Sequence, residues 1–145
     1  MPWGYVVLVS KDETTWATID GPRGVLFYSV IGDVFDYEFD AVGLSPGVGY
    51  SLIYYADPWP GSNSARISAG TSDEVTGDIH LEGSVDLTMS IPVPQDHNCA
   101  TTPAGAKIWL VLSDDYDTEA GKMVNYNPEE WLFETSLIFY IDTDG

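Results

Sequence analysis

Hydrophobic and polar residues alternate most regularly between Phe35 and Ala41. Phe35, Tyr37, Phe39 and Ala41 occupy every second position, and aspartate or glutamate fills each position between them. A period of two predicts a β-strand with one face buried and the other in water. The next apolar segment, at 49–56, is rich in aromatic and β-branched residues and predicts a second strand.

The connection between these two strands resembles the tyrosine corner of fibronectin-type and immunoglobulin-like sandwiches. Leu44 is followed two residues later by Pro46, and Tyr50 comes four residues after that. In the tyrosine corner the phenol hydroxyl bonds to the backbone a few residues upstream and fixes a Greek-key crossing. The alternative is an ordinary Pro-Gly turn followed by a core tyrosine.

The remaining pattern predicts further strands and almost no helix. Only one short helical turn is expected, near 128–132, because Asn127 and Pro128 have the form of a helix start. At 145 residues the chain has the length of one domain, residues 1–145. We therefore expect an all-β, antiparallel Greek-key β-sandwich of immunoglobulin or fibronectin-like topology, with eight to nine strands. The other expected strands are 5–9, 25–31, 66–71, 78–87, 106–113 and 132–141, with a short strand or loop at 14–19.

The charge balance narrows the range of partners. Five Lys and Arg residues stand against 23 Asp and Glu, which gives a net charge of −18. Phosphate contacts need cations on the protein, so nucleic acid is excluded as a partner and binding to anionic lipid is disfavoured. No apolar run approaches a membrane span, so membrane insertion is not expected. The single cysteine, Cys99, means that no internal disulfide forms.

Four segments together resemble an uncharacterised domain of secreted and surface proteins in archaea and some bacteria. They are YSLIYYADPWPG (50–61), GDIHL (77–81), AKIWLVLSDDYD (106–117) and NPEEWLFE (127–134). The resemblance implies an extracellular or cell-surface location and no particular activity. The chain also enters an apolar strand almost at once, without a signal peptide. We expect a module of a longer extracellular protein, with a non-enzymatic structural or adhesion role and with surface proteins or polysaccharide as partners.

Calcium is the candidate cofactor. Calcium takes six to eight oxygen ligands, best supplied by closely spaced carboxylates and carbonyls on loops. Asp114, Asp115 and Asp117 follow a predicted strand directly and are the preferred ligands. The alternative is a solvated acidic surface. Other acids near predicted strand ends are Asp33, Asp36, Asp57, Asp142 and Asp144.

Carbohydrate binding is the alternative function. Trp59 lies between two prolines, with Tyr55, Asp57, Asn63 and Arg66 close to it in the sequence. A flat ring covers the apolar face of a pyranose while polar side chains bind its hydroxyls. The simpler interpretation is that Trp59 folds down and closes one end of the sandwich.

Two further tryptophans and the first strand have simpler interpretations. Trp109 and Trp131 lie in strongly apolar patterns, which predict core positions. The strand from Trp3 to Val9 is expected to be the first strand of the sandwich. A second alternative function is self-association, in which this strand pairs with the sheet edge of a neighbouring copy.

Catalysis and transition-metal binding have little support in the sequence. His97 and Cys99 offer two ligands, but no histidine follows Cys99 as a blue-copper site requires, and His80 lies on a different predicted strand. The chain has only two histidines and no G-x-S-x-G nucleophile motif. Among 23 acids no catalytic pair can be selected. No catalytic residue is therefore expected.

Overall fold

The computed structural model describes residues 3–102 and 104–144, and within these ranges it confirms the predicted all-β fold. Among the described residues no helix is long and apolar enough to cross a lipid bilayer. The three short 3-10 helices are η1 (His97–Ala100), η2 (Ser113–Asp115) and η3 (Pro128–Glu130). The strands are β1 (Trp3–Lys11), β2 (Thr18–Ser29), β3 (Ile31–Gly32), β4 (Phe35–Val42), β5 (Gly49–Tyr55), β6 (Ala65–Thr71), β7 (Ile79–Val85), β8 (Lys107–Leu112), β9 (Tyr116–Asp117), β10 (Lys122–Met123), β11 (Leu132–Glu134) and β12 (Ile141–Asp142).

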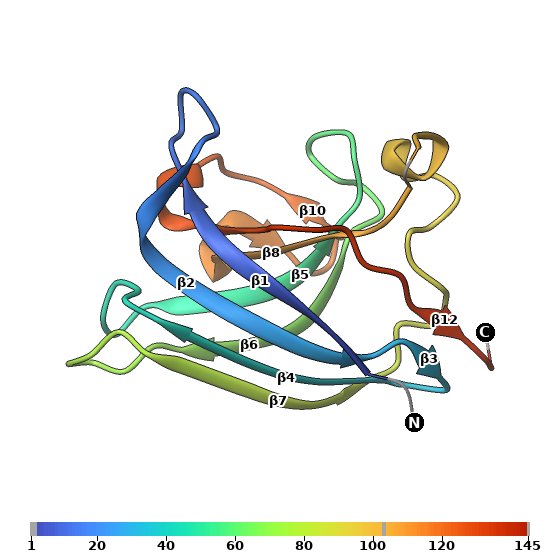
Figure 1. Ribbon diagram of the computed structural model, residues 1–145, viewed down its shortest axis with the longest axis horizontal. Coiled ribbons are helices and arrows are strands. Elements are labelled where there is room, and N and C mark those ends of the chain that lie inside the picture. The colour runs from blue at the N-terminus through green and yellow to red at the C-terminus, as the bar shows by residue number, and fades with distance from the viewer. Residues whose placement is uncertain (1–2, 103, 145) are drawn as a thin grey trace.

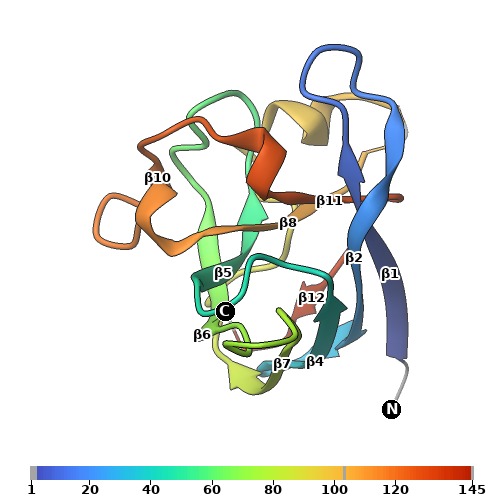
Figure 2. The same cartoon turned by 90° about the vertical axis from the view of Figure 1, so that its left-hand side faces the viewer.

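Eight strands form one antiparallel sheet in the order β6-β5-β8-β11-β1-β2-β4-β7. The sheet curves until its two edge strands, β6 and β7, lie in contact, so the molecule resembles a barrel (Figures 1 and 2). Across this seam the hydroxyls of Tyr37 and Ser68 are hydrogen-bonded at 2.9 Å. The chain passes from β4 to β5 across the ends of β7 and β6, which is a Greek-key crossing. Both sides of the core therefore belong to a single hydrogen-bonded sheet.

β4 has one buried and one exposed face, as its alternating sequence predicts. Phe35, Phe39 and Ala41 are buried in the main core, whereas Glu38 and Asp40 are exposed. β4 pairs with β2 on one side and with the edge strand β7 on the other, and its inward face contributes to the main core.

The predicted tyrosine-corner contact is present. Tyr50 is 1% exposed, and its hydroxyl accepts a hydrogen bond from the backbone N–H of Ser45 at 3.2 Å. Leu44, at the start of the connection, is also buried. This contact joins the beginning of the crossing to the strand that follows it.

β5 and β8 are buried on both faces of the sheet. On β5, Leu52 and Tyr54 pack inward, and Ile53 and Tyr55 pack outward into a second apolar cluster. The segment 113–131 crosses the outer face and covers part of this second cluster. Trp131, the last residue of this segment, belongs to the cluster and is 1% exposed, which confirms its predicted core position. The buried members of the outer cluster are Ile53, Tyr55, Val111, Tyr116, Met123, Trp131 and Phe133.

A buried carboxylate fixes the segment 113–131 in place. Asp115 is 2% exposed, and its Oδ2 accepts a hydrogen bond from Trp131 Nε1 at 2.9 Å. Its Oδ1 accepts a second bond from Asn127 Nδ2 at 3.0 Å. The Asp115 carbonyl accepts a third from the backbone N–H of Val124 at 2.8 Å. One residue therefore joins three parts of the covering segment.

The C-terminal region differs from the single strand predicted at 132–141. β11 ends at Glu134, because the chain then leaves β1 and pairs with the irregular segment 91–106 instead. Ile138 and Tyr140 form isolated bridges to Ala106 and Ile91. The helical turn predicted near 128–132 is the 3-10 helix η3, which spans Pro128–Glu130.

Replacing Asp115 by alanine is expected to lower the free energy of unfolding by about 2–3 kcal/mol, because it leaves the buried indole N–H of Trp131 without an acceptor. Urea denaturation monitored by tryptophan fluorescence measures the change. Asp114→Ala is the matched control, since the Asp114 side chain is exposed and such substitutions stay within about 0.5 kcal/mol of wild type. Equal losses in both variants would contradict the anchoring role of Asp115.

Candidate ligand-binding cleft

A cleft of about 630 Å³ opens on the outer face of the sheet, beside the segment 113–131. The loops 12–17 and 56–64 and the 3-10 helix η1, with the residues beside it, gather at the same end of the molecule (Figures 1 and 2). The floor comes from β5, β8 and β11, and the walls come from these loops. The lining residues are Lys11, Trp16, Tyr55, Asp57, Pro58, Trp59, His97, Asn98, Lys107, Trp109, Tyr126, Phe133 and Glu134.

Strand alternation explains why β8 and β11 present their side chains to the cleft. On β8, Ile108 and Leu110 are fully buried in the inner core, so Lys107 and Trp109 point to the opposite face. On β11 Leu132 lies in the inner core and Phe133 in the outer cluster. Two strands that are adjacent in the sheet therefore place an aromatic floor under the cleft.

Stacked aromatic rings form this floor. The rings of Tyr55 and Trp109 are nearly parallel, 10° apart, with centroids separated by 3.9 Å. Trp109 also contacts Phe133 edge to face at 5.2 Å and Trp131 at 5.8 Å. Such pairs contribute about 0.5–1.5 kcal/mol each beyond the area that they bury. Trp109 is only half-buried. One part of its side chain packs in the outer aromatic cluster, as its predicted core position implies, and the rest faces the cleft.

Trp59 stands at one end of the floor and is 45% exposed. It lies over Trp131, with ring planes 18° apart and centroids 6.2 Å apart, and it meets the edge of Tyr126 at 5.2 Å. One side of the indole therefore packs against the outer cluster, and Trp59 does not close an end of the fold as the simpler interpretation predicted. Much of the ring nevertheless remains accessible in the cleft.

Trp16 stands in the loop that joins β1 and β2, and it also lines the cleft. It is 45% exposed and meets Phe133 edge to face at 5.4 Å. The hairpin loop that carries Trp16 is ordered by Asp12, whose Oδ1 accepts the backbone N–H groups of Thr14 and Thr15. The cleft thus has a half-exposed tryptophan on the β5–β6 loop and another on the β1–β2 loop.

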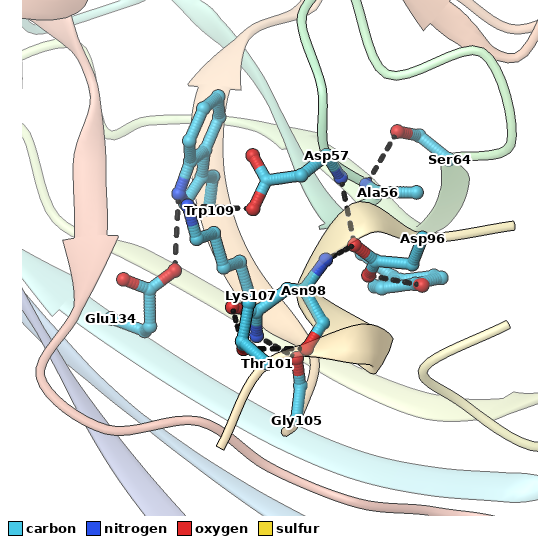
Figure 3. A network of polar contacts seen from close by, with 11 residues as sticks. Ala56, Asp57, Ser64, Asp96, Asn98, Thr101, Gly105, Lys107, Trp109 and Glu134 are labelled. Atoms are coloured by element: carbon cyan, nitrogen blue, oxygen red, sulfur yellow. Dashed lines mark hydrogen bonds and ion pairs between the residues drawn. The ribbon is translucent and has the colours of Figure 1, made fainter. Parts of the chain in front are cut away.

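An ion pair and a buried aspartate organise the polar side of the cleft (Figure 3). Lys107 Nζ lies 2.8 Å from Asp57 Oδ2. Asp96, which is 2% exposed, accepts hydrogen bonds from the backbone N–H groups of Asp57 and Asn98 at 3.0 Å and 2.9 Å. Its other oxygen accepts the hydroxyl of Tyr54 at 2.7 Å. Asp96 therefore holds two loops that carry cleft residues against the end of β5.

Glu134 is the second carboxyl group of the cleft. Its Oε1 accepts a hydrogen bond from Trp109 Nε1 at 3.1 Å (Figure 3). Burial raises the pKa of Glu134 to about 7, and the nearby charges of Lys107 and Lys11 and the bond from Trp109 oppose this rise only in part. The cleft therefore holds a carboxyl group that changes charge near neutral pH.

Three of the five residues predicted to bind sugar line the cleft: Tyr55, Asp57 and Trp59. Asn63 and Arg66 do not line it, although both are exposed. The residues that sequence reasoning missed come from distant segments. Two features of the sequence could have indicated the cleft: Trp16 within a polar hairpin loop, and Lys107 and Trp109 on the same face of a predicted strand. The missed residues are Lys11, Trp16, His97, Asn98, Lys107, Trp109, Tyr126, Phe133 and Glu134.

The predicted calcium ligands do not form a common site. The carboxylate of Asp115 is buried and bonded to Trp131 and Asn127, and Oδ1 of Asp117 accepts the backbone N–H groups of its own turn at 119 and 120. Asp114, Asp115 and Asp117 are absent from the groups of described residues whose ligand atoms lie within 4.8 Å of one another. Calcium binding stays a prediction without an assigned site.

The candidate transition-metal ligands His80, His97 and Cys99 do not come together in one group among the described residues. His97 lines the cleft and Cys99 is half-buried in the same 3-10 helix, but neither belongs to a group of three close ligands among the described residues. His80 lies on β7, where it pairs with Asp40. Potential ligand side chains lie close together in two places on the described surface, one formed by Glu38, His80 and Glu82 and the other by Asp86, Asp142 and Asp144. The second group contains Asp142 and Asp144, two of the acids noted near predicted strand ends.

Comparison with known proteins gives no family assignment. No family model matches the chain, and neither curated proteins nor solved structures gave a match. The resemblance to a domain of secreted proteins therefore stays an expectation from the sequence.

The ionisation of Glu134 is expected to make stability depend on pH. Its pKa in the folded protein, about 7, is above its ordinary value of 4.5, so folding favours the protonated form. This contribution is fully present below pH 4.5 and is lost as the pH rises through 7, by about 3 kcal/mol in total.

Urea denaturation of wild type and Glu134→Gln between pH 4 and 8 isolates this contribution, because the other acids titrate in both proteins. The variant is expected to become the more stable of the two as the pH rises. A stability difference that stays constant over this range would refute the raised pKa.

Proposed function

We propose that this protein is a non-catalytic carbohydrate-binding domain of the cell surface or extracellular space, with the saccharide bound in the aromatic cleft. The observation that carries the proposal is the pair of half-exposed tryptophans, Trp16 and Trp59, beside a floor that combines aromatic rings with charged groups. In this function the cleft would attach the protein to polysaccharide.

The chemistry of the cleft matches a sugar better than a purely apolar ligand. A pyranose has a face of C–H groups that packs against an indole, and hydroxyls at its edge that need polar partners. Asp57, Lys107 and Glu134 supply charged partners at the floor, and Asn98 adds an amide. The volume of about 630 Å³ lies within the usual range for small-ligand sites, roughly 300–1,000 Å³.

The charge of the whole chain supports a carbohydrate partner over other polymers. With a net charge of −18, the protein repels the phosphate backbone of nucleic acids and the head groups of anionic membranes. Self-association through the first strand receives less support, because β1 already pairs with β2 along its length and with β11 at Leu8 and Val9. Polysaccharide is therefore the partner that we propose.

Replacing Trp59 by alanine is expected to weaken binding to the recognised polysaccharide at least about tenfold, because the sugar loses the exposed indole face. Affinity electrophoresis on a panel of plant, bacterial and animal polysaccharides identifies the ligand, and intrinsic fluorescence titration measures the affinity of each variant.

Trp3→Ala is the matched control, since Trp3 is 52% exposed and lies outside the cleft. It should bind as wild type does, and a thermal melt should show that both variants are folded. Equal binding by the Trp59 variant, or no binding to any polysaccharide, would contradict the proposal. Release of reducing ends from a bound polysaccharide would instead assign the cleft to glycoside hydrolysis.

A further inference from the structure

We infer that the saccharide bound in the cleft is acidic, and that its single anionic group, a uronate carboxylate or a sulfate ester, binds the ammonium group of Lys11. This inference rests on the carbohydrate-binding function proposed above and names the chemical class of its ligand.

The first argument is the distribution of cations over the chain. The protein has only five Lys and Arg residues and a net charge of −18, yet two of the five, Lys11 and Lys107, line the same cleft. A neutral sugar needs hydrogen-bond partners but no surplus of positive charge. Two ammonium groups in one cleft of so acidic a protein favour an anionic ligand.

The second argument is that the two lysines differ in their partners. Lys107 is neutralised by Asp57 at 2.8 Å (Figure 3). Lys11 makes no ion pair within 4.0 Å to any carboxylate of the residues 3–102 and 104–144. Its ammonium lies 5.8 Å from the centroid of the Phe133 ring, a cation–π contact that holds the charge beside the aromatic floor. Lys11 is therefore available to an anion on the ligand.

The third argument concerns Glu134, which shares the cleft with both lysines. Burial raises the pKa of this carboxyl group to about 7. When Glu134 is protonated, two ammonium groups face the single carboxylate of Asp57, so these four side chains carry one net positive charge. When Glu134 ionises, that surplus disappears. An acidic ligand should therefore bind best below pH 7.

The net charge of the protein also limits the kind of acidic saccharide. A densely charged polyanion would be repelled by the 18 net negative charges, and this repulsion is screened only beyond about 8 Å at physiological salt. A saccharide with one isolated acidic sugar can place that group at Lys11 and its remaining neutral rings along the tryptophans. We therefore expect a sparsely charged glycan.

An array of oligosaccharides tests the inference, with each uronate-bearing member printed beside its neutral methyl ester and beside a singly sulfated analogue of the same backbone. The acidic members should bind about tenfold more tightly than their ester partners at pH 6. The sulfated member shows which anion is preferred. Equal or tighter binding of the esters would overturn the inference while leaving carbohydrate binding intact. Binding of no member would overturn the proposed function as well.

Two variants connect the preference to the named residues. Lys11→Met keeps the apolar stem and removes the charge, so it should abolish the difference in affinity between the acidic saccharide and its ester. Lys122→Met is the matched control, because Lys122 lies on β10 outside the cleft and should leave both affinities unchanged. A preserved preference in the Lys11 variant would overturn the assignment.

The pH dependence provides an independent readout. Wild-type affinity for the acidic member should fall about tenfold from pH 5.5 to 8.5, whereas affinity for its ester should change less. Glu134→Gln removes the contribution of Glu134 and should flatten this slope, while the other charged and titratable cleft residues, Lys11, Asp57, His97 and Lys107, are the same in both proteins. An unchanged slope in this variant would exclude Glu134 as the source of the pH dependence.

Discussion

The stacking of Tyr55 on Trp109 is the interaction on which the outer half of the molecule depends. These rings come from β5 and β8, which are neighbours in the sheet, and their inward-facing neighbours Tyr54 and Ile108 belong to the main core. The stack is therefore supported from below by a fully packed interior. The segment 113–131 packs against one side of this outer aromatic layer, and the cleft occupies the side that this segment leaves uncovered. A rigid floor of this kind presents its rings without a further loss of side-chain entropy on binding.

Two buried aspartates fix the segments around this layer, and both carboxylate oxygens of each accept hydrogen bonds. Asp115 joins the covering segment to Trp131, and Asp96 joins two cleft loops to Tyr54. A buried carboxylate is costly unless donors surround it, so neither segment can shift without leaving a charge unsatisfied. In a chain with 23 acidic residues, these two serve as structural connectors.

Local sequence predicted the parts of the fold that local chemistry determines. Alternation identified β4 and its buried face, and Pro46 with Tyr50 identified the crossing that follows. The cleft was only partly predictable because its residues come from strands that pair over long distances. Alternation shows that Lys107 and Trp109 share a face, but it does not show that β11 lies beside β8 and brings Glu134 to them. The burial of Asp115 could not be predicted for the same reason, because it depends on a contact with Trp131, which is 16 residues away in the sequence.

The closure of the sheet between β6 and β7 has a consequence for the behaviour of the protein in crowded solution. The two strands meet through side chains such as Tyr37 and Ser68, and no backbone ladder joins them along their described lengths. Each strand therefore has an edge of unpaired peptide groups, of the kind that initiates intermolecular β-pairing and aggregation. Because the two edges face each other, each strand sterically shields the other from a third strand. The curvature that forms the barrel thus also shields these two strand edges from intermolecular β-pairing.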